Sequence, residues 1–149
     1  MTYTILNAGL PDPVHEARFY DGVPFRRAMA WVIDILIIGL TSLLLLPLTL
    51  FIAVFFLPAF AAVIGFLYRW FTISGGSATW GMRMMGIELR QADGSYMTSG
   101  AALMHTIGYV ASMAVFPLQL VSIALMLIGD RKQGLTDNVL GTAAINRPL

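Results

Sequence analysis

The sequence contains no cysteine and very little charge. Only 11% of its 149 residues are Asp, Glu, Lys or Arg, whereas soluble domains carry about 25%. The lack of cysteine excludes disulfides, thiolate metal sites and cysteine nucleophiles. The shortage of charge excludes a soluble fold, because 58% of the residues are hydrophobic and too few polar side chains are left to cover a surface. With a mean hydropathy of +0.77, the composition is typical of a membrane protein.

Several function classes are excluded on the same grounds. The net charge is +1 and the basic residues are dispersed, so we expect no nucleic-acid partner. The two histidines, His15 and His105, lie far apart in the sequence, and no spacing typical of a metal site or a nucleophile with its base is present. We therefore expect no enzyme activity, no cofactor and no metal.

A long uncharged run predicts two membrane crossings. No ionisable side chain occurs from Ile35 to Leu67, which is more than one crossing needs and fits two antiparallel helices. We place these helices at about 26–46 and 50–71, with Pro58 as a kink inside the second. Tyr68-Arg69-Trp70-Phe71 is typical of the interfacial belt that ends a crossing.

The segment 72–99 is the longest polar connection. Thr79 is expected to cap a short helix over residues 80–85 that ends at Gly86. The alternation in Ile87–Arg90 and the Asp93-Gly94 turn signal then predict a small β-hairpin on the cytoplasmic side, outside the membrane.

A third apolar segment, about 101–128, leaves two alternatives open. It is interrupted by His105 and Pro117, and it crosses the membrane once or breaks at Pro117 and folds back. We expect residues 1–22 to form an uncleaved N-terminal tail and residues 129–149 a polar tail. The predicted fold is an all-α membrane domain over residues 23–147, with a transmembrane helical hairpin, the third apolar segment and the small β-hairpin.

Three sequence blocks, in this order, resemble the RDD family of small bacterial membrane proteins. They are Arg27-x6-Asp34, the run from Thr79 to Ile87, and Gly134-Leu135-Thr136-Asp137. The resemblance implies that Arg27, Asp34 and Asp137 are the signature residues and form a buried charge cluster. The chain departs from the family pattern at two positions. Met82 stands where the family usually has a lysine, and His105 stands where many relatives carry a basic residue. The supporting positions are Thr79, Gly81, Gly86 and Thr142.

Asp34 has two interpretations. A carboxylate inside an apolar helix costs about 2.5–3.5 kcal/mol on insertion scales, so it needs a partner. It is either a cation or proton site, or half of a structural ion pair with Arg27 that Asp137 joins as a second acceptor. We favour the structural interpretation. Similarly, His105 is expected to be a hydrogen-bonded histidine that is also able to titrate near neutral pH.

The distribution of basic residues predicts the orientation. Arginines flank the start of the first helix and the end of the second, while the turn between them has no Lys or Arg. The N-terminus is therefore placed in the cytoplasm, for a protein of the bacterial inner membrane. Arg131 and Lys132 in the C-terminal tail favour the same side, which requires the break at Pro117. Residues 141–146 are expected to form a short strand or an extended end, and such a break would also let residues 142–146 approach the Ile87–Arg90 strand.

Two functions from different classes follow. The first is a small-solute or ion transport component that uses the Arg27 and Asp34 cluster. The second is a non-catalytic assembly or accessory subunit of a larger membrane complex. Besides the lipid bilayer, we expect a homo-oligomeric partner or another membrane protein. A transporter would lose activity but keep its fold on Asp34→Asn, whereas a structural ion pair would lose abundance.

Overall fold

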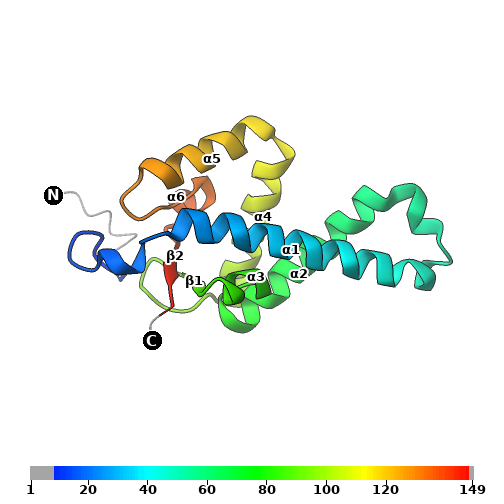
Figure 1. The fold of residues 1–149 in the computed structure, drawn as a ribbon, viewed down its shortest axis with the longest axis horizontal. Helices are drawn as coiled ribbons and strands as arrows, with labels where there is room; N and C mark the ends of the chain where they lie inside the picture. Colours follow the sequence, from blue (N-terminus) through cyan, green and yellow to red (C-terminus); the bar gives the residue numbers. More distant parts are fainter. Residues whose placement is uncertain (1–8, 148–149) are drawn as a thin grey trace.

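A long helical hairpin dominates the computed structural model, which describes residues 9–147 (Figure 1). The first helix, α1 (Val23–Leu45), starts with Pro24 in its first turn, where the missing N–H costs no hydrogen bond. The second, α2 (Leu57–Gly76), runs back beside it. Two helical segments, Ala17–Thr49 and Ile52–Gly76, are long and apolar enough to cross a membrane.

The turn of the hairpin is longer than expected. Two short 3-10 helices, Leu46–Thr49 and Ile52–Phe56, occupy it, and Leu50 and Phe51 between them adopt left-handed φ angles of 55° and 63°. As a result α2 begins at Leu57 rather than near residue 50. The kink expected at Pro58 is wrong, because this proline lies in the first turn of α2 and starts the helix instead.

A short helix follows the hairpin. Helix α3 (Trp80–Met84) is capped by Thr79, whose hydroxyl accepts a hydrogen bond from the Met82 N–H at 3.2 Å. The helix packs against α1, and Gly86 ends it with a φ of +73° that few side chains tolerate. The expected cap and helix end are therefore present.

The predicted β-hairpin is wrong in its pairing. Strand β1 (Ile87–Arg90) pairs antiparallel with β2 (Ala143–Asn146) from the C-terminal part of the chain, with Ile87 opposite Asn146 and Arg90 opposite Ala143. The segment after β1 contributes only an isolated bridge from Arg90 to Tyr96. The reason is burial: the first three residues of β2 are buried apolar side chains, whereas the residues after β1 are polar and mostly partly or fully exposed.

The third apolar segment folds back. It divides at Val115 into α4 (Ser99–Ala114) and α5 (Phe116–Ile128), which are bent by 116° with Pro117 in the first turn of α5. At about 1.5 Å per residue, each is shorter than the hydrocarbon core of about 30 Å. Helix α6 (Leu135–Leu140) then packs on α4 and α5 and leads into β2.

The two ends of the long hairpin differ. At the sheet end, α1, α2, α3 and β1 enclose a core that includes Val23, Ala30, Ile73, Met82 and Ile87. At the turn end, α1 and α2 extend beyond the other helices (Figure 1), and their apolar side chains are exposed. The polar and charged side chains that are buried lie mainly in the part of the molecule where the other elements cover the hairpin.

Candidate functional site

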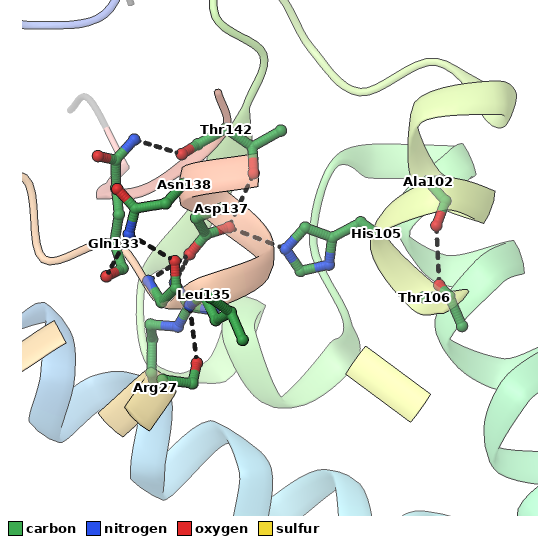
Figure 2. A network of polar contacts seen from close by, with 11 residues as sticks. Arg27, Ala102, His105, Thr106, Gln133, Leu135, Asp137, Asn138 and Thr142 are labelled. Carbon is green, nitrogen blue, oxygen red and sulfur yellow. Dashed lines mark hydrogen bonds and ion pairs between the residues drawn. The ribbon is translucent and has the colours of Figure 1, made fainter. Parts of the chain in front are cut away.

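Asp137 is the centre of a buried polar network. Its carboxylate, at the first turn of α6, is fully buried and is bound by the guanidinium of Arg27. Its Oδ1 lies 2.9 Å from His105 Nε2 and accepts a hydrogen bond from the Thr142 hydroxyl at 2.8 Å, and its Oδ2 accepts one from the Gly134 N–H at 3.1 Å. Figure 2 shows Arg27, His105 and Thr142 converging on this one side chain.

This network joins elements that are far apart in the sequence. Arg27 comes from the start of α1, His105 from α4, and Thr142 from the segment between α6 and β2. Because each contributes a donor to a buried carboxylate, the network fixes α6 against the hairpin and against α4. It therefore holds the returning third segment in place.

The charge of Asp137 is stabilised by these partners. Burial alone would raise the pKa of its carboxyl group, but the positive charge of Arg27 and the hydrogen bond from His105 outweigh burial and hold the pKa well below its usual value of 3.8. Asp137 is therefore a permanent anion at physiological pH.

The structure does not bring Asp34 into this network. Asp34 is 2% exposed, and its Oδ1 accepts hydrogen bonds from the Tyr68 hydroxyl at 2.6 Å and the Gly81 N–H at 2.9 Å. Its Oδ2 accepts one from the Thr79 hydroxyl at 2.6 Å. Neutral donors, rather than Arg27, therefore satisfy this carboxylate. The physical reason is distance along α1, since seven residues rise about 10 Å, together with the position of α3 directly over Asp34.

Gly81 has a steric role in the Asp34 site. A Cβ atom at this position would clash with the Ala30 carbonyl oxygen and lie 2.7 Å from Asp34 Oδ1. Only glycine allows the backbone of α3 to approach α1 this closely. The positions that the resemblance singled out thus divide into two sites. Arg27, His105, Thr142 and Asp137 form one, and Asp34, Thr79 and Gly81 form the other.

Arg69 is a functional candidate that the sequence analysis assigned to the interfacial belt. Its side chain is buried, with 6% exposure, and its guanidinium lies over the Tyr109 ring at 4.0 Å from the ring centre. The Tyr109 hydroxyl in turn accepts a hydrogen bond from Trp31 Nε1 at 2.8 Å. Among the residues that the structure describes, Nε of Arg69 has no hydrogen-bond partner.

A cavity of about 780 Å³ lies beside these residues. Its wall includes Arg27, Asp34, Arg69, His105 and Asp137, and the rest is mostly apolar side chains of α1, α4 and α5. The volume falls within the range of about 300–1,000 Å³ found for small-molecule sites. Within residues 9–147, no group of three or more His, Asp or Glu side chains is arranged to hold a metal ion.

One of the comparisons with known proteins identifies a family. The family model described as "RDD family" matches residues 22–141, which include the wall of the cavity and, apart from Thr142, both carboxylate sites. Among curated proteins and among solved structures, no significant match was found.

Proposed function

Because the chain belongs to the RDD family and has two helices of membrane-spanning length, we propose that it is an integral protein of the bacterial cytoplasmic membrane and a component of small-solute or ion transport. In this proposal the solute enters the cavity between α1, α4 and α5. The carrying observation is a cavity inside the apolar part of the chain whose wall holds charged side chains from three different helices, α1, α2 and α6.

The orientation supports access from the cytoplasm. Arg26 and Arg27 precede most of α1, and Arg83 and Arg90 follow α2. Because α4 and α5 fold back, the tail with Arg131 belongs to the same end of the hairpin, and the turn 46–56 has no basic residue. If this end of the hairpin lies in the cytoplasm, all these cations are cytoplasmic, in agreement with the enrichment of cytoplasmic loops in Lys and Arg.

The depth of the cavity also suits transport. Helices α4 and α5 form a re-entrant pair, and such backbone is tolerated at membrane depth where protein or water covers it. Polar side chains on the inner side of this pair, Ser112 and Gln119, bond to each other at 3.1 Å and line the cavity. A water-filled cavity that enters from one side is one half of an alternating-access path.

Single-cysteine labelling tests this proposal, since the native chain has no cysteine. Met113→Cys places a thiol on the cavity wall near the deep end of α4, and Val110→Cys is the matched control on the same helix. The two native side chains are 39% and 42% exposed, and only Met113 lines the cavity. A membrane-impermeant maleimide reacts with a thiolate in water, so it should label Met113→Cys much faster than Val110→Cys, and only from the cytoplasmic side.

Equal and slow labelling of both thiols would contradict a water-accessible cavity. It would favour the second function, an accessory subunit, in which lipid or a helix of a partner protein fills this space. The large apolar side chains exposed along the turn end of the hairpin are compatible with either lipid or such a partner.

A further inference from the structure

Arg69 is a buried cation without a counter-ion in the part of the chain that the structure describes. Guanidinium groups stay protonated in proteins, and an isolated charge in an apolar environment is costly unless it is paired. The side chain is 6% exposed and forms no salt bridge among these residues. A site with this property is incomplete until an anion enters it.

The nearby carboxylates do not complete it. Both oxygens of Asp34 are occupied by hydrogen bonds from Tyr68, Thr79 and Gly81. Both oxygens of Asp137 are occupied as well, by Arg27 among others. Neither carboxylate is free to turn toward Arg69 without leaving its own donors unpaired.

Arg69 is also held in position. Its guanidinium lies 4.0 Å from the centre of the Tyr109 ring, which is a cation–π contact. The ring is fixed by the hydrogen bond from Trp31 Nε1, and all three residues line the cavity. A planar, fixed guanidinium matches the two oxygens of a carboxylate or phosphate.

The rest of the cavity wall indicates which chemical group would accompany an anion bound at Arg69. Beyond the charged side chains, the wall is formed mainly by apolar residues of α1, α4 and α5. These include Val32, Met113, Phe116, Ile123 and Leu127. Such a surface binds hydrocarbon rather than a small hydrated anion.

We propose that the cavity binds an amphipathic oxyanion, whose carboxylate or phosphate head pairs with Arg69 and whose acyl chain lies along α5. This inference rests on the proposed function, because it names the class of solute. The head and chain belong either to a free single-chain carboxylate or to an anionic membrane phospholipid, and both present the same chemistry to Arg69.

Quenching of tryptophan fluorescence tests the proposal, because Trp31 lines the cavity. The full-length protein in nanodiscs of zwitterionic lipid is titrated with dodecanoate brominated at its chain end, and in parallel with the equally brominated dodecanol. Bromine quenches a nearby indole, so the titration gives an apparent dissociation constant for each compound. The constant for the carboxylate should be at least about tenfold lower than that for the neutral alcohol. A third arm uses nanodiscs that contain brominated phosphatidylglycerol or brominated phosphatidylcholine, and a preference for the former identifies the membrane as the source.

Variants assign the binding to one side chain. Arg69→Gln should weaken dodecanoate binding by at least about tenfold, and Arg69→Lys should keep part of it. Arg83→Gln is the matched control, because the Nε of Arg83 is likewise buried without a partner among the described residues but lies outside the cavity wall. It should bind as the native protein does. A thermal unfolding midpoint for Arg69→Gln at or above the native value shows that its fold is intact.

The proposal would be overturned by equal binding of the alcohol and the carboxylate, or by equal binding of dodecanoate to Arg69→Gln and to the native protein. Absence of Arg69-dependent quenching in every arm counts in the same way. These failures differ from failure of the proposed function. Labelled Met113→Cys without anion binding refutes only the class of solute, whereas unlabelled Met113→Cys refutes the transport component.

Discussion

Arg27 and Arg69 both contribute to the wall of one cavity, yet their surroundings are opposite. Arg27 is bound to the Asp137 carboxylate, which His105 and Thr142 also contact. Arg69 lies on an aromatic ring and has no carboxylate partner among the described residues. A buried charge that is paired with an opposite charge stabilises one arrangement, whereas a buried charge without an ionic partner retains affinity for a ligand of opposite charge. We therefore assign stability to the first region and binding to the second.

The largest expected effect on stability comes from breaking the ion pair between Arg27 and Asp137. Arg27→Gln leaves the buried Asp137 carboxylate without its cation, which should cost about 3–5 kcal/mol of unfolding free energy. Arg26→Gln is the control, because within residues 9–147 the Arg26 side chain donates only to the Met85 carbonyl and the Asn146 side chain, at 3.4 and 3.1 Å, and its loss should cost about 1 kcal/mol. Denaturant unfolding in detergent measures both. Equal losses would remove the distinction between a structural ion pair and an ordinary hydrogen bond.

The second effect concerns the Asp34 site. Gly81→Ala should cost about 1–3 kcal/mol, because the new methyl group meets the Ala30 carbonyl oxygen and the Asp34 carboxylate. Gly100→Ala is closely matched. Each glycine is the second residue of a helix capped by a threonine, but a Cβ at Gly100 meets nothing within 4 Å. Thermal unfolding should show a loss for Gly81→Ala alone, and similar midpoints for the two variants would contradict close packing of α3 on α1.

The third effect is a dependence on acid. The folded-state pKa of Asp137 is below its usual value of 3.8, so its contribution to stability is present above about pH 3.8 and is progressively lost as the pH falls below that value. Asp137→Asn should lower stability near neutral pH and make the decline in acid shallower. Asp93→Asn is the control, since Asp93 is exposed and its pKa is lowered mainly by hydrogen bonds from Ser95. Unfolding midpoints are measured across the acid range. Their dependence on pH should differ from that of the native protein less for Asp93→Asn than for Asp137→Asn.

The smallest effect on stability is expected at Arg69, the residue assigned to binding. Arg69→Gln removes a buried charge that has no ionic partner, so the unfolding free energy should stay level or rise slightly. A loss comparable with that of Arg27→Gln, measured under the same conditions, would show that Arg69 stabilises the fold and would erase the contrast between the two arginines.

Sequence reasoning reached the features that depend on local chemistry. Pro24 at a helix start, Thr79 as a cap and Gly86 as a helix end all follow from rules about neighbouring residues. The local β-hairpin is the failure, whereas the approach of residues 142–146 to Ile87–Arg90, expected from a break at Pro117, is confirmed. The turn signal at Asp93-Gly94 predicted a local hairpin, but strand β1 has its partner in β2, because the apolar residues of β2 gain more from burial there.

The candidate site was predictable only in part. The family resemblance singled out Arg27, Asp34 and Asp137, but it could not show that Asp34 has its own donors from α2 and α3. Arg69 was missed because an arginine between Tyr68 and Trp70 is typical of an interfacial belt. The available signal was the length of the helix: α2 continues to Gly76, which places Arg69 inside the helix rather than at its end.

The Asp137 network, the sheet and the cavity all require that the third apolar segment fold back. Paired reporters, one active only in the cytoplasm and one only outside, should be fused before Met1, within the turn 46–56 and after Leu149. Both termini should lie in the cytoplasm and the turn outside. A C-terminus on the outside would contradict this arrangement, since β2 and Asp137 would then be separated by the membrane from β1 and Arg27.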